Sequence, residues 1–267
     1  MSERPHAAAA RFLGRRALIT GAGGAVGRAI ALGLAGEGAR TALVGRQMSA
    51  LQSVVLAAWD GQAEPVCYQA DVTSDADVAS LGTALARDFE GLDILVHSAG
   101  VISMGTVECT EVSAFDAQYG VNLRGPYALT RMFLPLLRKS AGQVVFINSS
   151  IGFRARAQFG PYAATKHGLR ALADSLRQEV NGDGIRMLSV FLGRTAGEMQ
   201  RRIHAQEGKA YQEERLIQPR DVASVVLAAL ALDRTAEVTD IVIRPLAPPA
   251  ATKAGDERIR HEGVGKP

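Results

Sequence analysis

Residues 19–30, ITGAGGAVGRAI, join a short apolar run to a helix-like pattern through a glycine-rich turn. The run before the turn, Arg16–Thr20 (RALIT), has the apolar character of a buried strand, and residues 26–37 repeat apolar side chains at helical spacing. The glycines between them permit backbone conformations and close approaches that a Cβ atom would prevent. A strand, a tight turn and a helix in this order are typical of the first unit of an open α/β sheet.

The same alternation continues along the chain. Further apolar runs with little in/out alternation are RTALVG, PVCYQA, LDILVHSAG, QVVFINSS, IRMLSVFLG and DIVIRPL, as expected of strands covered on both faces. Helical periodicity separates several of them, over residues 26–37, 75–89, 162–180 and 221–232, and Ser74 with Asp77 predicts a capping box. We therefore predict an α/β protein: a single-domain, Rossmann-like, doubly wound sheet of about seven parallel strands with helices on both faces.

Length and composition fit one domain over residues 14–246, because 267 residues with 47% hydrophobic side chains contain no linker-like break. Residues 1–13 and 247–267 lack apolar periodicity, and we expect flexible tails there. Without an apolar run of about 18 residues we expect no membrane partner and a cytoplasmic location. Cys67 and Cys109 are expected to be buried, reduced thiols, and Trp59 a packing residue at a helix end.

Charge and histidine spacing argue against two classes of partner. The net charge is +3, but the arginines and lysines are spread along the chain without aromatic interleaving, so we expect no nucleic-acid partner. His97, His167 and His204 lack metal-ligand spacing, and no metal site is predicted. A small-molecule ligand remains the expected partner.

The predicted strand ends indicate where such a ligand binds. Five of the strands run into small and polar residues, and ligands of doubly wound sheets bind at the carboxyl ends of the strands. The N–H groups of a glycine-rich turn can approach a pyrophosphate, whose charge the helix N-terminus favours. A turn that binds nothing remains an alternative, because a glycine pattern alone is a weak signal.

The turn TGAGGAVG resembles the T-G-x-x-x-[AG]-x-G motif of the short-chain dehydrogenase/reductase family, with Thr20, Gly21, Ala25 and Gly27 in the defining places. The resemblance covers residues 14–246. It implies an NAD(P)-dependent oxidoreductase that interconverts a carbonyl and a secondary alcohol by hydride transfer. A 3-ketoacyl thioester reductase and a catalytically idle, dinucleotide-sensing binding protein are the two alternatives.

Four residues match the catalytic set of that family. Tyr162 and Lys166 are four residues apart in PYAATKHG, so a helix places them on one face, where an ammonium would lower the pKa of the phenol. The resemblance adds Ser149, thirteen residues before Tyr162, and Asn122 in GVNLRGPY, while Ser150 is the competing serine. It implies that Tyr162 is the acid/base, Ser149 hydrogen-bonds the reacting oxygen, Lys166 binds the nicotinamide ribose and Asn122 completes a proton path.

The resemblance also implies the cofactor contacts. Besides Tyr162 and Lys166, they are Thr20, Gly21, Gly23, Ala25, Val26, Gly27, Arg46, Asp71, Val72, Ser98, Ala99, Gly100, Gly193 and Thr195. Arg46 stands where an acidic residue would select NAD, and a guanidinium can pair with a 2′-phosphate. We therefore expect NADP(H) to be preferred and NAD(H) to be possible, with a solvated Arg46 as the alternative.

The segment LGRTAGEM departs from the family's P-G-x-V-x-T pattern, because Leu192 replaces the proline and Gly197 the threonine. A hydroxyl contact to the carboxamide is then missing or moved to Thr195. Residues 197–218 occupy the place of a substrate lid. Arginines expected on the substrate side, either solvated or holding an anion, are Arg154, Arg156, Arg194, Arg201 and Arg202. Relatives lead us to expect a homotetramer or homodimer through residues 113–139 and 162–181.

Overall fold

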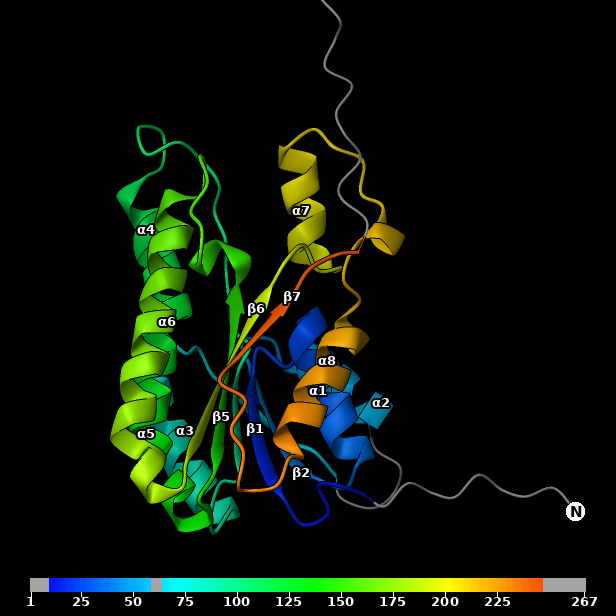
Figure 1. Cartoon of the computed structure of the whole chain (residues 1–267), viewed down its shortest axis with the longest axis vertical. Helices are drawn as coiled ribbons and strands as arrows, with labels where there is room; N and C mark the ends of the chain where they lie inside the picture. The colour runs from blue at the N-terminus through cyan, green and yellow to red at the C-terminus, as the bar shows by residue number, and fades with distance from the viewer. Residues whose placement is uncertain (1–9, 59–63, 247–267) are drawn as a thin grey trace, which may run out of the picture.

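One parallel sheet organises the computed structural model, which describes residues 10–58 and 64–246 (Figure 1). Within these residues the sheet has seven strands in the order β3-β2-β1-β4-β5-β6-β7, all pairs parallel. The strands are β1 (Arg16–Thr20), β2 (Arg40–Gly45), β3 (Val66–Gln69), β4 (Ile94–His97), β5 (Gln143–Ser149), β6 (Arg186–Leu192) and β7 (Asp240–Ile243). The order reverses between β1 and β4, which confirms the predicted doubly wound sheet.

Helices cover both faces of the sheet. They are α1 (Ala25–Gly36), α2 (Met48–Ala58), α3 (Asp75–Asp88), α4 (Val112–Tyr119), α5 (Gly125–Ser140), α6 (Gly160–Val180), α7 (Glu198–Gln206) and α8 (Pro219–Leu230). A π-helical turn, η1 (Gly120–Arg124), joins α4 to α5, and short 3₁₀ turns are η2 (Ser150–Gly152), η3 (Asn181–Asp183) and η4 (Glu213–Arg215). In Figure 1, α3 to α6 lie on one side of the strands, α1, α2 and α8 lie on the other, and α7 stands beyond the carboxyl ends of β6 and β7.

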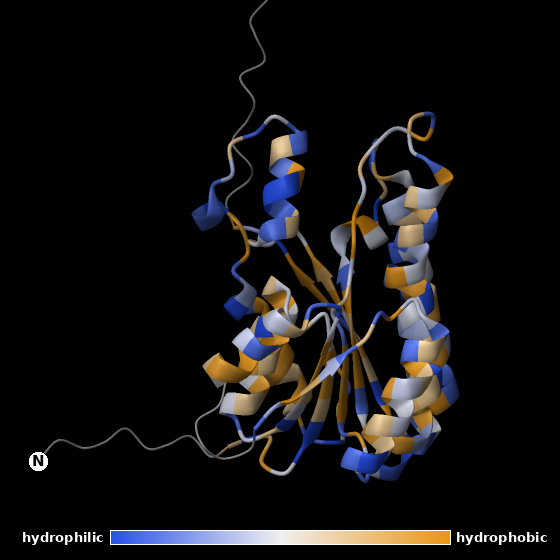
Figure 2. Cartoon of the chain, turned by 180° about the vertical axis from the view of Figure 1, so that it is seen from behind, coloured by the Kyte–Doolittle hydropathy of each residue, from blue (hydrophilic) through white to orange (hydrophobic). Residues whose placement is uncertain are grey.

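Each face of the sheet has its own apolar core. On one face Leu34 of α1 and Val226 of α8 pack with strand residues, and on the other Phe133 of α5 and Leu169 of α6 pack around Phe146 of β5. Figure 2 shows the mostly hydrophobic strands between the two helical layers. Fully burying a side chain of this size contributes roughly 1.5–3 kcal/mol, so the strands are held from both sides and their backbones have little freedom at the site.

The helix predictions agree with the structure to within two residues for α1, α3, α6 and α8. Ser74 caps α3, since its hydroxyl oxygen accepts the N–H of Asp77 at 3.2 Å. The second half of the predicted capping box differs: the Asp77 carboxylate accepts the main-chain N–H of Asp71 at 2.8 Å. The cap therefore also positions the residue that follows β3.

Two local expectations are corrected. Cys109 is exposed and Cys67 is only partly buried, although both are free thiols. Cys109 lies in a turn outside both cores, so its position could not be inferred from the general preference of cysteine for burial. Phe12, expected in a flexible tail, is buried in the core that contains α1, and its N–H donates to Glu37 O at 3.0 Å.

Other expectations fall outside the described residues. These are Trp59 and the remainder of the two tails, residues 1–9 and 247–267. Within the described ranges, none of the helices combines the length and apolarity needed to cross a bilayer.

Candidate active site

The glycine turn after β1 packs directly on the end of β4. Gly21 has φ +64°, and a Cβ atom there would lie 2.7 Å from main-chain atoms of Ala99. A Cβ on Gly27 would lie 2.3 Å from the Gly21 oxygen, so the third glycine is required by the turn itself. The Thr20 hydroxyl oxygen accepts the N–H groups of Ser98 at 3.1 Å and Ala99 at 3.3 Å. These contacts join two of the predicted cofactor segments.

The N-terminus of α1 has the properties of an anion site. Its N-cap is Gly24, which offers no side-chain cap, and its first turn contains no acidic residue. Gly23, Gly24 and Ala25 are exposed. The partial positive charge of the helix and the free N–H groups of its first turn therefore face solvent, an arrangement into which a pyrophosphate fits.

The segment after β6 reaches back onto this turn. Gly197 has φ +142°, and a Cβ atom there would lie 2.8 Å from the Cβ of Ala25. The N–H of Gly197 donates to the Tyr211 hydroxyl at 3.0 Å. The Thr195 hydroxyl donates to the Gly193 oxygen at 3.2 Å. Gly197, which departs from the family motif after β6, thus meets Ala25 of the glycine turn in space.

Arg46 and Asp71 follow neighbouring strands at the same edge of the sheet. Arg46 is exposed after β2, just before α2, whose Ala50 packs against Gly23 of the turn. The Asp71 carboxylate accepts the N–H and the hydroxyl of Thr73 at 2.9 and 2.7 Å. The Thr73 N–H lowers the pKa of Asp71 from its ordinary value, and the charge of Arg46 acts in the same direction. Val72, the next predicted contact, is buried.

Asn122 lies in the π-helical turn and is fully buried. Its Oδ1 accepts the N–H of Val101 at 2.9 Å, and its Nδ2 donates to the Val101 oxygen at 2.9 Å and to the Thr165 hydroxyl at 3.2 Å. The Gly100 Cα is close beside it. Asn122 therefore ties the segment after β4 to α6, and the π-helical turn that holds it is a distortion that is frequent at functional sites.

Ser149 and Tyr162 meet between β5 and α6. Tyr162 is buried, and the Ser149 hydroxyl hydrogen-bonds the phenol. Ser149 also accepts the Ile151 N–H at 3.2 Å, while Ser150 already belongs to η2. Burial raises the pKa of Tyr162 to about 12, and the hydrogen bond from Ser149 partly opposes that change. At neutral pH the phenol is therefore a proton donor.

Lys166 lies one helical turn beyond Tyr162, with its Nζ 5.8 Å from the centre of the phenol ring. The Nζ donates to the Ile147 oxygen at 2.9 Å, and burial lowers the pKa of Lys166 to about 8. We expected the ammonium to lower the pKa of Tyr162, and the structure shows the opposite direction. The reason is that the ammonium is directed to a main-chain carbonyl, so that burial dominates the environment of the phenol.

Asn148 was not predicted as a site residue, although it positions Ser149 and Lys166, two of the four predicted catalytic residues. Its Nδ2 donates to the Lys166 oxygen at 3.1 Å and its Oδ1 accepts the Ser149 N–H at 2.7 Å. A Cβ on Gly152 would lie 2.7 Å from that Oδ1, so the glycine makes room for the amide. A buried amide in an otherwise apolar strand was the available signal, because buried polar groups need partners.

Strand order explains how all these residues are arranged. Following the sheet from β3 to β6, the strand ends provide Asp71 and Val72, then Arg46, the glycine turn, residues 98–100, Ser149, and Gly193 with Thr195. The predicted cofactor residues therefore span the carboxyl edge, and the predicted catalytic residues cluster at η1, β5 and α6. Such an edge, at the point where strand order reverses, is where doubly wound sheets bind ligands.

Three arginines near α7 already have carboxylate partners. Arg194 pairs with Glu207, Arg202 pairs with Glu198 at 2.9 Å, and Arg201 lies 4.0 Å from Glu198 and 3.6 Å from Glu213. Arg154 and Arg156 are exposed. The paired arginines stabilise the segment above the site rather than presenting free charge to it.

Comparison with known proteins identifies the family to which this chain belongs. The short chain dehydrogenase family profile matches residues 15–208. The chain belongs to this family. An uncharacterised oxidoreductase of Staphylococcus aureus strain USA300 is 30% identical over 231 residues, 86% of this chain and 96% of that protein. This chain is therefore an oxidoreductase of the short-chain dehydrogenase family, a group that acts on alcohol or carbonyl groups.

Two solved structures share this short-chain dehydrogenase fold. Levodione reductase is 28% identical, with a TM-score of 0.81 over 87% of this chain and 97% of that one. An alcohol dehydrogenase from the archaeon Thermococcus sibiricus, complexed with 5-hydroxy-NADP, is 25% identical, with a TM-score of 0.80 over 87% of this chain and 97% of that one. The family match over residues 15–208 includes both the glycine turn and the residues around Tyr162.

Replacing Lys166 by Met should change how the free energy of unfolding depends on pH. The folded-state pKa is about 8 against 10.5 ordinarily, so above about pH 8 the folded chain releases a proton that the unfolded chain still holds. The cost of burying the charge is complete below that pH and decreases above it. From about pH 8 to 10 the wild type should gain about 2–3 kcal/mol over Lys166→Met, measured by urea denaturation.

The exposed Lys139 provides the matched control. Lys139→Met should follow the wild type throughout, because its charge is solvated in both states. The range stops near pH 10 because ionisation of Tyr162 in the unfolded chain then acts with the opposite sign. A constant difference between wild type and Lys166→Met over the whole range would contradict the assignment.

Proposed function

We propose that this chain is an NADP(H)-preferring oxidoreductase that interconverts a carbonyl and a secondary alcohol, with Tyr162 as the acid/base. The observation that supports this most is the cluster at β5 and α6: two hydroxyls hydrogen-bonded to each other, with a buried lysine one helical turn away. This cluster lies on the same edge of the sheet as the open N-terminus of α1. Chemistry and cofactor binding can therefore meet at one site.

Tyr162, Ser149 and Lys166 would each have a separate role in the proton transfer. When bound, the nicotinamide supplies or accepts the hydride. In reduction, Tyr162 donates its proton to the substrate oxygen, a role that suits a phenol whose pKa burial raises to about 12. Ser149, already hydrogen-bonded to Tyr162, stabilises the negative charge that develops on that oxygen. Lys166 is largely protonated at pH 7, and its ammonium can stabilise the phenolate that remains.

Asn122 and Asn148 would act by holding these catalytic residues in position. Asn122 fixes Thr165, which donates to the main-chain oxygen of Tyr162 at 2.8 Å. Asn148 fixes Ser149 and the main chain of Lys166. Each amide uses both its oxygen and its nitrogen, so the side chains that touch the substrate would be held without freedom to turn away.

The cofactor would be held along the carboxyl edge. The open helix N-terminus and residues 20–27 suit the pyrophosphate, while Asp71 and Val72 suit the adenine. The ends of β4 and β6, with Lys166, suit the nicotinamide half. Arg46 supports the NADP preference, because its guanidinium is exposed after β2 and can pair with a 2′-phosphate. The archaeal alcohol dehydrogenase of the same fold was solved with an NADP derivative.

Substrate class and the rival functions are addressed by one screen. Oxidation of NADPH would be followed with ketones, sugars, steroids and acyl thioesters. Turnover of ketones but not thioesters supports the proposal. A preference for 3-ketoacyl thioesters would show instead that the protein is a 3-ketoacyl thioester reductase. Tight binding of NADPH without turnover of any carbonyl would indicate a dinucleotide-sensing protein.

Tyr162→Phe should lower kcat for the best ketone at least about 100-fold, because the proton donor is lost. Binding of NADPH, measured by fluorescence titration, should change less than about threefold, since the packing of the ring is retained. Tyr68→Phe is the matched control: it also removes one phenol hydrogen bond, to Asp88 at 2.6 Å, and it lies on β3, outside the cluster at β5 and α6. A Tyr162→Phe enzyme with undiminished kcat would exclude the acid/base role.

Arg46→Ala should raise the KM for NADPH by about 10-fold to 100-fold, the value of one or two charge-assisted hydrogen bonds. The KM for NADH should stay within about twofold, because NADH lacks the 2′-phosphate. Arg138→Ala, an exposed arginine paired with Asp183 at the other end of the sheet, serves as control. Equal loss for both cofactors would show that Arg46 acts on folding rather than on selection.

We also propose that the chain assembles as a homotetramer or homodimer through α4, α5 and α6. The large apolar side chains exposed on α4 and α5 are Val112, Phe115, Tyr119, Tyr127 and Met132. Tyr127→Asp should reduce the particle mass measured by light scattering, because it places a charge in that face. Leu56→Asp, an equally polar change on α2, should leave the mass unaltered. A wild-type monomer at micromolar concentration would exclude the proposal.

A further inference from the structure

A polar cavity lies at the opposite end of the sheet from the candidate active site. Its volume is about 190 Å³. Arg15 precedes β1, Asp93 precedes β4, and Gln143 and Arg186 begin β5 and β6, so the cavity faces the amino ends of four strands. The segment after α8, with Arg234, closes another side. None of these residues belongs to the cofactor edge.

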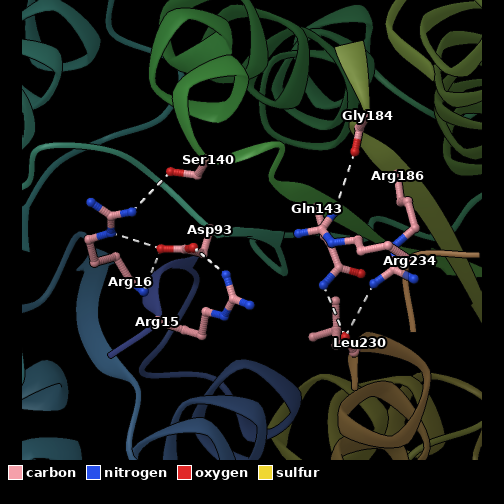
Figure 3. A network of polar contacts seen from close by, with 9 residues as sticks. All are labelled: Arg15, Arg16, Asp93, Ser140, Gln143, Gly184, Arg186, Leu230 and Arg234. Carbon is pink, nitrogen blue, oxygen red and sulfur yellow. Dashed lines mark hydrogen bonds and ion pairs between the residues drawn. The ribbon is translucent and has the colours of Figure 1, made fainter. Parts of the chain in front are cut away.

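The lining of this cavity is positively charged. Four arginines (Arg11, Arg15, Arg186 and Arg234) and two aspartates (Asp93 and Asp233) line it, so positive charges exceed negative ones by two. Arg11 pairs with Glu37 outside the cavity. Figure 3 shows the remaining guanidinium groups, which come from Arg15 before β1, Arg186 of β6 and Arg234 after α8.

The buried carboxylate of Asp93 cannot neutralise all the arginines that line the cavity. Asp93 is 5% exposed, and both of its oxygens are already used. Its Oδ1 accepts from Arg15 at 3.0 Å, and its Oδ2 accepts from the side chain of Arg16 at 2.8 Å and from the Arg16 N–H at 3.0 Å. The hydrogen bonds of this carboxylate are thus committed to the β1 side of the cavity, although its charge still acts on Arg234 and opposes the lowering of that pKa.

The guanidinium of Arg186 is held by several main-chain oxygens, whereas that of Arg234 has few partners among the described residues. The Arg186 guanidinium donates to main-chain oxygens just after α8, at 3.2 Å to Leu232 and 3.0 Å to Asp233. A cation at the C-terminus of a helix is stabilised by the helix dipole. Arg234, in contrast, makes one hydrogen bond within the described residues, to the Gly184 oxygen at 3.3 Å. Most of the donors on its guanidinium remain available.

These charges also act on one another. Burial lowers the pKa of Arg186, and the positive charge of Arg234 lowers it further. Burial likewise lowers the pKa of Arg234, with Arg15 acting in the same direction. Mutual repulsion of this kind is relieved when an anion enters the cavity.

We propose that this cavity binds the phosphate group of a small anionic ligand, with Arg15 and Arg234 as the principal donors. A guanidinium presents parallel N–H groups that match phosphate oxygens, and two of them from different segments favour a polyvalent anion. The site is separate from the cofactor edge and does not depend on the proposed reaction. Its occupant would join β1 to the segment after α8, and so stabilise the folded chain.

Calorimetric titration of pyrophosphate into the full-length protein tests the proposal. The double variant Arg15→Gln/Arg234→Gln should bind pyrophosphate at least about 10-fold more weakly than the wild type, the effect of losing two charge-assisted contacts. Arg16 still holds Asp93 in this variant, so the fold should persist. Its melting temperature in phosphate-free buffer checks that directly. The single variant Arg234→Gln, in an exposed segment, should show an intermediate loss.

Two controls separate this cavity from other sites. Arg138→Gln removes a similar exposed charge at the same end of the sheet and should bind pyrophosphate as the wild type does. Saturating NADPH, which would occupy the glycine turn, should leave the binding of pyrophosphate to the wild type unchanged. Loss of pyrophosphate binding in the presence of NADPH would place the pyrophosphate at the glycine turn and overturn the proposal. Unchanged binding in the double variant, or no wild-type binding at about 10 mM, would also overturn it. Tighter binding of citrate than of pyrophosphate would exclude phosphate as the preferred group.

Discussion

The contact between Gly21 and the main chain of Ala99 is the constraint on which the rest of the candidate site depends. It lets the turn after β1 lie against the end of β4 with no side chain between them. The hydroxyl of Thr20 then reaches the N–H groups of two residues after β4 and fixes the distance between the strands. Because of this, the open end of α1 and the residues around Asn122 face the same space.

The chemistry of the site depends on polar groups buried in an apolar scaffold. Asn122, Asn148 and Thr165 each satisfy their hydrogen bonds with main chain or with one another. A buried polar group without a partner costs roughly 1–3 kcal/mol, so these networks admit one arrangement. Tyr162 and Lys166 sit inside that arrangement with pKa values shifted by burial in opposite directions.

Local patterns predicted much of this. Continuous apolar runs identified the strands, and the spacing from Ser149 to Tyr162 and Lys166 identified the residues that the structure brings together. What sequence could not provide were effects of three-dimensional contact. The direction of the Lys166 side chain, which leaves the pKa of Tyr162 raised, depends on the Ile147 carbonyl of a neighbouring strand. The role of Asn148 and the arginine cavity likewise depend on which strand ends become neighbours.

The meeting of Ala25 with Gly197 links two positions that are far apart in the chain. A side chain at 197 would collide with the methyl of Ala25, and the backbone there has a φ that only glycine adopts readily. Position 197 therefore cannot accept a side chain while Ala25 keeps its methyl group and the backbone keeps this φ. A threonine at 197 would demand both a smaller residue at 25 and a refolded start of α7. The segment above the site and the cofactor turn are thus packed as one unit, and a grafted segment with a side chain at 197 requires a matching change in the turn.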